Sequence, residues 1–91
     1  MIAPRILLIE DEPALVRGLG DMLRANGFTV TVATDGERGL DAALSNEADL
    51  ILLDVMLPRV NGYEICRAAR AQGLDVPILM LTAKGREEDV I

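Results

Sequence analysis

The chain has 91 residues, with nine Lys and Arg against fifteen Asp and Glu, which gives a net charge of −6. This length allows one domain, and a hydrophobic share of 51% with few aromatic residues indicates a core of aliphatic side chains. The negative charge disfavours direct binding of nucleic acid or of an anionic membrane by this segment. The absence of histidine excludes His-based catalytic triads and His metal sites.

The first predicted element is a strand that runs into an acidic turn. Residues 5–9 form a short apolar run with β-branched residues, and three acids follow it directly: Glu10, Asp11 and Glu12. Pro13 then stands where the first turn of a helix tolerates proline. These residues predict the first strand–helix unit of the fold.

The helix that follows is predicted to end at Gly27, because apolar residues recur at helical spacing up to that point. Its apolar positions are Leu15, Val16, Leu19, Met22 and Leu23. Gly18 and Gly20 lie inside the helix and not in a loop after a strand, as a dinucleotide-binding fingerprint would require. We interpret both glycines as close-packing positions.

Residues 28–32 alternate between apolar residues and threonine, which is typical of a half-exposed strand at a sheet edge. Thr34 and Glu37 are spaced as in a capping box, so a short second helix is predicted to begin there. One glycine, Gly39, lies inside this helix and indicates a softer element. The apolar side of the helix would be formed by Leu40, Ala43 and Leu44.

A continuous apolar run begins at Leu50 and ends in a single carboxylate, Asp54, which predicts a strand buried on both faces. In open α/β sheets, ligands bind just outside the carboxyl ends of the strands, so Asp54 is a candidate nucleophile. The alternative is that Asp54 only caps the next turn. A loop then leads into a third helix that ends near Gln72, with three predicted buried residues: Ile65, Cys66 and Ala69.

The last predicted elements are a fourth buried strand over residues 76–82, with Thr82 as its last member, and the first turn of another helix over residues 85–91. Strands that alternate with helices predict an α/β fold with a parallel sheet covered on both faces. The chain shows no apolar run long enough to span a membrane and no secretory signal pattern, and its single cysteine can form no intrachain disulfide. We therefore expect a cytoplasmic protein without a membrane partner.

Polar residues end three of the four predicted strands: Glu10 and Asp11, Asp54, and Thr82. Because parallel strands end at the same rim, these residues are expected to form one site. Neighbouring carboxylates repel one another, and Mg²⁺ suits an all-oxygen cluster without His or Cys. An aspartate in such a site can attack phosphorus and form an acyl phosphate, with a hydrogen bond from Thr82. Taken singly, each residue is as well explained as an ordinary helix start or strand end.

Three segments resemble the receiver domain of two-component response regulators: residues 6–13, residues 52–58 with Gly62 following, and residues 77–83. The resemblance covers almost the whole chain and implies a flavodoxin-like sandwich with strand order 2-1-3-4. It also implies roles for five residues: Asp54 as phosphoacceptor, Asp11 as a direct Mg²⁺ ligand, Glu10 as a ligand through water, the Met56 main-chain carbonyl as a further ligand, and Thr82 as the switch hydroxyl.

The resemblance implies a sensor histidine kinase as partner, no enzymatic role beyond the domain's own phosphoryl transfer, and a DNA-binding output domain beyond this segment. A full receiver also has a complete fourth helix, a fifth strand that ends in a lysine, and a last helix. Residues 1–91 are therefore predicted to be a receiver domain truncated at the start of the fourth helix. Surfaces for a possible dimer would lie largely in the missing part, and the edge of the fourth strand is expected to be open to pairing.

Lys84 lies too close to Thr82 to replace the missing lysine, so phosphorylation of this segment is expected to be weak or lost. A receiver-like interaction module that signals without phosphorylation is therefore an alternative function. An aspartyl phosphatase is a weaker alternative, because Met56 stands where a second acid would be needed.

Overall fold

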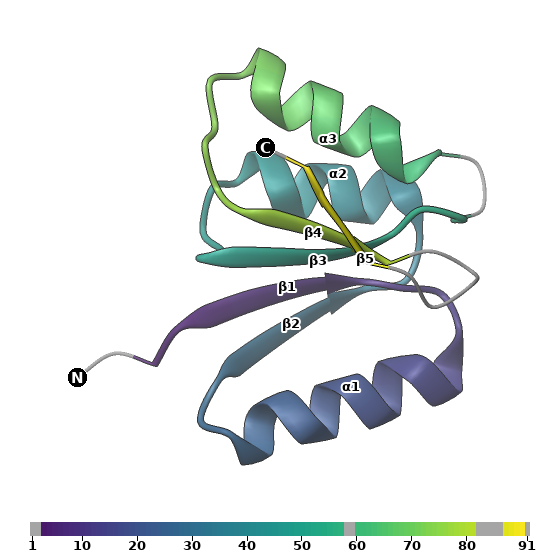
Figure 1. Ribbon diagram of the computed structural model, residues 1–91, viewed down its shortest axis with the longest axis vertical. Helices are drawn as coiled ribbons and strands as arrows, with labels where there is room; N and C mark the ends of the chain where they lie inside the picture. The colour runs from purple at the N-terminus through teal and green to yellow at the C-terminus, as the bar shows by residue number, and fades with distance from the viewer. Residues whose placement is uncertain (1–2, 58–59, 82–86, 91) are drawn as a thin grey trace.

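The computed structural model describes residues 3–57, 60–81 and 87–90. Its elements, in chain order, are β1 (Arg5–Ile9), α1 (Pro13–Ala25), β2 (Thr29–Ala33), α2 (Gly36–Leu44), β3 (Leu50–Asp54), α3 (Gly62–Ala71), β4 (Ile78–Leu81) and β5 (Glu87–Val90). One sheet joins the strands in the order β2-β1-β3-β4-β5. Helix α1 covers one face of the sheet, and α2 and α3 cover the other (Figure 1). The predicted α/β sandwich with strand order 2-1-3-4 is confirmed.

The first four strands are parallel, and their register brings the carboxyl ends of β1, β2 and β3 to one rim. Ile9, the last residue of β1, pairs with Ala33 on one side and with Leu53 on the other. Asp54 pairs with Leu81 at the end of β4. The residue that follows β1 and the last residue of β3 therefore meet at this rim, as the sequence predicts.

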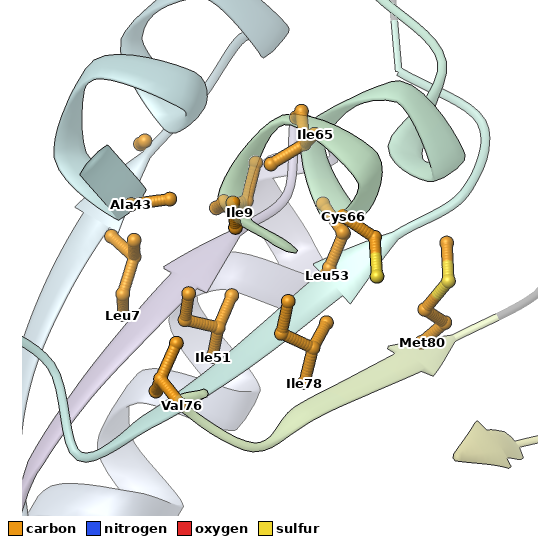
Figure 2. Packing of buried hydrophobic residues seen from close by; sticks show 12 residues of the cluster. Leu7, Ile9, Ala43, Ile51, Leu53, Ile65, Cys66, Val76, Ile78 and Met80 are labelled. Carbon is orange, nitrogen blue, oxygen red and sulfur yellow. The ribbon is translucent and has the colours of Figure 1, made fainter. Parts of the chain in front are cut away.

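The larger core cluster lies between the sheet and the α2–α3 layer (Figure 2). Side chains of β1, β3 and β4 point toward the two helices in this cluster, and α3 contributes the three residues predicted to be buried. Its twelve buried members are Leu7, Ile9, Ala33, Ala43, Ile51, Leu53, Ile65, Cys66, Ala69, Val76, Ile78 and Met80. This packing fixes β3 and α3, the two elements on either side of the loop after Asp54.

The face under α1 is less completely buried. Only Ile6, Leu8 and Leu52 are buried there among the described residues, although half-buried side chains of α1 and β2 pack against them. Two apolar residues of the helical pattern in α1, Leu15 and Met22, are 50% and 52% exposed. The predicted apolar stripe of α1 is therefore only partly used in the core.

The carboxyl-terminal segment differs from the prediction. Residues 87–90 form β5, which pairs antiparallel with β4 in the register Ile78↔Val90, instead of the first turn of a helix. The physical reason is that the outer edge of β4 carries backbone N–H and C=O groups that need partners, and a strand can pair with them. The edge that we expected to be open is thus occupied by the chain itself (Figure 1).

Two local predictions are also wrong. Helix α2 begins one residue later than the capping box implies, because the N-cap is Asp35, whose Oδ1 accepts a hydrogen bond from the Arg38 N–H at 2.8 Å. Gly18 is not a close-packing position, since a Cβ atom at this residue would meet no described atom within 4 Å outside its own turn of chain. The other glycine of α1, Gly20, is buried, but a Cβ there would meet only the Arg24 side chain.

Candidate functional site: an acidic cluster at the carboxyl ends of β1 and β3

The site is built from residues at the ends of two neighbouring strands. Glu10 follows β1 directly, and its N–H donates to the Ala33 carbonyl oxygen at the end of β2, at 3.0 Å. Asp54 is the last residue of β3, and the next N–H, of Val55, donates to the Leu81 carbonyl oxygen of β4 at 3.0 Å. Sheet hydrogen bonds therefore hold the backbone on both sides of the cluster before any side chain is considered.

Three carboxylates meet at this point: Glu10, Asp11 and Asp54 each place an oxygen within 4.8 Å of the others. They differ in exposure, since Glu10 is only 3% exposed, Asp54 is half-buried and Asp11 is exposed. The predicted convergence of acids from the first and third strands is thus present in the structure. A cluster with one buried and one exposed member is open to solvent on one side only.

Backbone N–H groups orient two of these carboxylates. The Glu10 Oε2 atom accepts hydrogen bonds from the N–H groups of Asp11 and Glu12, both at 3.1 Å. The Asp54 Oδ1 atom accepts one from the Met56 N–H at 3.0 Å. These bonds follow from tight turns directly after each strand, and each fixes the rotation of a carboxylate. The contact with the Met56 N–H could not be predicted from the sequence, because any residue except proline can supply a backbone donor.

The pKa of the Glu10 carboxyl group is raised to about 7, chiefly by burial, with added contributions from the negative charge of Asp54, a hydrogen bond with the Asp54 side chain and the charge of Asp11. The hydrogen bond from the Glu12 N–H acts in the opposite direction. Near neutral pH, the metal-free cluster therefore holds a proton on Glu10 for part of the time. A bound cation would offset the same negative charges and would stabilise the ionised form of Glu10.

The donor set fits a hard divalent cation. All three side chains offer carboxylate oxygens, and the buried position of Glu10 removes much of the water that would otherwise screen the negative charges. Mg²⁺ binds through one or two carboxylates together with retained waters, and the exposed side of the cluster leaves room for such waters. Asp11 and Asp54, as the more accessible members, are suited to direct contact, and Glu10 to contact through water.

The loop after Asp54 is held close beneath it by Gly62, the first residue of α3. A Cβ atom at Gly62 would lie 2.8 Å from the Asp54 carbonyl oxygen and 2.9 Å from the Val55 Cα, so only glycine fits without moving the backbone. The Gly62 N–H also donates to the Val55 carbonyl oxygen at 3.1 Å. Asn61 caps α3 by accepting a hydrogen bond from the Tyr63 N–H at 2.8 Å.

Two residues singled out from the sequence, Thr82 and Lys84, lie outside the described residues. Cys66 is buried in the larger core cluster, which agrees with its interpretation as a core residue. No helix in the described ranges is long and apolar enough to cross a membrane.

Comparison with protein families identifies the chain. The model of the response regulator receiver domain matches residues 6–91. The chain belongs to this family. Receiver domains are signalling modules of two-component systems, and the recognition from the three motif segments is confirmed.

Two curated relatives are transcriptional regulators. The chain is 46% identical over 87 residues to the alkaline phosphatase synthesis transcriptional regulatory protein PhoP of Bacillus subtilis, covering 96% of this chain and 36% of that protein. It is also 46% identical over 87 residues to the DNA-binding response regulator MtrA of Mycolicibacterium smegmatis, with 96% and 38% covered. The chain thus spans little more than a third of the length of these relatives.

Solved structures of receiver domains superpose closely on this chain. The receiver domain of the sensor histidine kinase PA1611 from Pseudomonas aeruginosa, solved with a magnesium ion coordinated in its active site cleft, matches with a TM-score of 0.82 and 37% identity, covering 90% of this chain and 69% of that one. The chemotaxis protein CheY4 of Vibrio cholerae matches with a TM-score of 0.80 and 30% identity, covering 88% and 68%. Both likenesses support the flavodoxin-like assignment of the receiver fold.

Proposed function

We propose that this receiver domain accepts a phosphoryl group on Asp54 from a phosphohistidine of a sensor histidine kinase, in a reaction that requires Mg²⁺. The observation that carries the proposal is the meeting of Glu10, Asp11 and Asp54 within 4.8 Å at the carboxyl ends of β1 and β3. Asp54 is the acceptor in this proposal, because it ends the central buried strand and is the half-buried member of the cluster.

In the transfer, a carboxylate oxygen of Asp54 attacks the phosphorus atom, the bond from phosphorus to the kinase imidazole nitrogen breaks, and an acyl phosphate forms. The chain's part is to hold the nucleophile in one orientation. The Met56 N–H, which donates to Asp54 Oδ1 at 3.0 Å, restricts rotation of the carboxylate, and the β3–β4 hydrogen bonds restrict its backbone.

Asp11 and Asp54 would hold the cation directly, with Glu10 acting through water and the Met56 main-chain carbonyl as a further ligand. When bound, Mg²⁺ supplies positive charge that offsets both the carboxylates and the oxygens of the incoming phosphoryl group. Thr82 follows the end of β4 in sequence, and its hydroxyl is the proposed group that responds to the phosphoryl oxygens. Magnesium in the related PA1611 receiver supports the choice of metal.

The output is proposed to be transcriptional, through a DNA-binding domain that lies outside this segment, in a cytoplasmic protein. The relatives PhoP and MtrA are named as a transcriptional regulator and as a DNA-binding response regulator. The net charge of −6 disfavours DNA binding by the segment itself. A dimer of the phosphorylated protein would be compatible with this role.

The test is phosphorylation by a small donor. The complete protein is incubated with acetyl phosphate and Mg²⁺, and intact-protein mass spectrometry counts the phosphoryl groups added. We expect one group on the native chain, none without Mg²⁺, and none on Asp54→Asn. Equal labelling of Asp54→Asn would remove Asp54 from the mechanism.

A separate titration decides between this function and a phosphorylation-independent interaction module. Mg²⁺ is added up to millimolar concentration while amide NMR shifts of Asp11, Asp54 and Met56 are followed. Saturable shifts at these three residues support the metal-dependent function. Unchanged shifts, together with no phosphorylation, would favour the interaction module.

A further inference from the structure

Two glycines of α2 lie so close to residues next to the acidic cluster that a side chain at either position would overlap them. Gly36 and Gly39 are spaced three residues apart, so they lie on the same side of the helix, and both are buried. The sequence alone predicts only a softer helix at Gly39 and gives no signal at Gly36. Their contacts lead to the two strand ends that carry the acids.

Gly39 packs on the end of β1. A Cβ atom at this position would lie 2.6 Å from the Ile9 Cγ2 atom and 3.0 Å from its Cδ1 atom, well inside ordinary van der Waals contact. Ile9 is fully buried and directly precedes Glu10. A displacement of the Ile9 side chain or backbone would therefore move the β1 part of the cluster.

Gly36 packs on the loop that follows Asp54. A Cβ atom there would lie 2.4 Å from the Val60 Cβ and 3.2 Å from the Val60 Cα, so the obstacle includes the backbone and not only a flexible side-chain end. Val60 belongs to the loop between β3 and α3, whose first residues hold the Asp54 carboxylate through the Met56 N–H. The start of α2 thus lies against the β3 part of the cluster.

We propose that Gly36 and Gly39 are positioning residues for the acidic cluster: they let α2 rest on Val60 and Ile9 at once and thereby set the separation of Asp54 from Glu10 and Asp11. The proposal rests on the function proposed above only where Mg²⁺ binding is used as a readout. Because protein interiors are close-packed, an added methyl group that needs about 1 Å of extra space must push one of these partners away.

The first experiment is structural and needs no metal. Amide NMR spectra of metal-free Gly36→Ala are compared with those of the native chain and of Gly18→Ala, whose added methyl group meets open space. We expect shifts at Asp11, Asp54 and Met56 in Gly36→Ala and none at these residues in Gly18→Ala. If the amide resonances of these three residues do not shift in a folded Gly36→Ala chain, the positioning role is excluded.

The second experiment measures Mg²⁺ affinity and separates positioning from mere loss of stability. Small misplacements of binding groups are costly, so we expect Gly36→Ala to weaken Mg²⁺ binding about tenfold or more. The control is Val76→Ala, a buried change that lowers stability and precedes β4 at the opposite end of the sheet. It should retain native affinity while folded. Equal weakening in both variants would contradict the proposal.

A double substitution tests whether the Gly36–Val60 contact is the cause. Val60→Gly removes the atom that a methyl group at Gly36 would meet first. In the Val60→Gly background, Gly36→Ala should therefore change Mg²⁺ affinity much less than in the native background, whereas additive effects would contradict the contact. If Gly36→Ala does not fold, Val60→Ala, which removes the Cγ atoms at the same contact, is expected to shift the Met56 amide.

Failure of the two proposals can be told apart. A native chain that neither binds Mg²⁺ nor accepts a phosphoryl group contradicts the proposed function. The metal-free spectra still decide the positioning role in that case, because they report the placement of the strand ends directly. Native Mg²⁺ binding with an unchanged Gly36→Ala chain contradicts only the positioning role.

Discussion

The two faces of the sheet differ in how closely their helices approach. In the described part of the chain, the α2–α3 face buries twelve residues of its core cluster, whereas the α1 face buries three. The glycines of the helices show the same difference in packing. A Cβ atom at Gly36, Gly39 or Gly62 would overlap a neighbour, whereas a Cβ atom at Gly18 in α1 would not. The acidic cluster is supported from the closely packed side. On that side, a small displacement of a helix must move the neighbouring residues at the strand ends.

Residues on the closely packed face position the site, whereas residues on the α1 face mainly cover the sheet. Ile9, Leu53 and Ile65 are fully buried beside the strand ends and α3, so they define where the acids lie. On the other face, α1 leaves Leu15 and Met22 half exposed. We therefore expect substitutions on the two faces to differ in their effects on stability.

The largest expected effect is Ile65→Ala on the closely packed face. Ile65 is 0% exposed, so the substitution removes a buried side chain and leaves a cavity, with a loss of about 3–4 kcal/mol in the free energy of unfolding. Leu19→Ala on the α1 face removes a half-buried side chain and should cost about 1–2 kcal/mol. Urea denaturation followed by circular dichroism measures both. Equal losses would mean that the two faces are packed alike.

The second prediction concerns pH and Glu10. Because burial raises the pKa of Glu10 to about 7, above its ordinary value of 4.5, the metal-free folded state binds the extra proton more tightly than the unfolded state. This contribution to stability is present below pH 4.5 and is lost as the pH rises from about 4.5 to about 7. Its full size is about 3 kcal/mol by linkage.

Glu10→Gln isolates this contribution, because the amide cannot ionise and can still accept the backbone hydrogen bonds. In EDTA at pH 8, the variant should be more stable than the native chain in urea denaturation, and the difference should shrink toward pH 4.5. A native chain whose stability relative to Glu10→Gln does not change over this range would show that Glu10 titrates normally.

The acidic cluster could be predicted from the sequence because the local signals are strong, whereas the strand order 2-1-3-4 was implied by the resemblance to receiver domains. The apolar run that ends at Asp54 is typical of a strand buried on both faces, and parallel strands bring their carboxyl ends together. Glu10 and Asp11 therefore had to approach Asp54, which the structure bears out. The backbone contact from Met56 could not be predicted, because it depends on turn geometry and not on residue type.

The wrong predictions share one cause, which is that they depend on how closely another part of the fold approaches the residue. Residues 87–90 carry acids that favour a helix start, but the unpaired edge of β4 offers backbone partners that the local pattern does not reveal. Gly18 and Gly39 are both glycines inside amphipathic helices, and only the distance to the neighbouring element distinguishes them. The roles of Thr82 and of the Met56 carbonyl stay predictions.

The third prediction concerns the start of α2. Asp35→Ala removes the side chain that accepts the Arg38 N–H, and should lower the free energy of unfolding by about 1 kcal/mol. Thr34→Ala is the matched control, since Thr34 is exposed and is not the N-cap residue. Urea denaturation of the two variants checks the observed cap. A larger loss for Thr34→Ala would restore the capping box predicted from the sequence.

The smallest expected effect is Gly18→Ala, which should stabilise the chain by about 0.5–1 kcal/mol. The residue lies inside α1 with open space where a methyl group would go, so alanine gains helix propensity and restricts the unfolded chain without meeting a neighbour. The same substitution at Gly39 should destabilise, because its methyl group would meet Ile9. Urea denaturation of both variants gives the two signs. A destabilising Gly18→Ala would mean that α1 is packed as closely as α2, and the contrast between the two faces would then be lost.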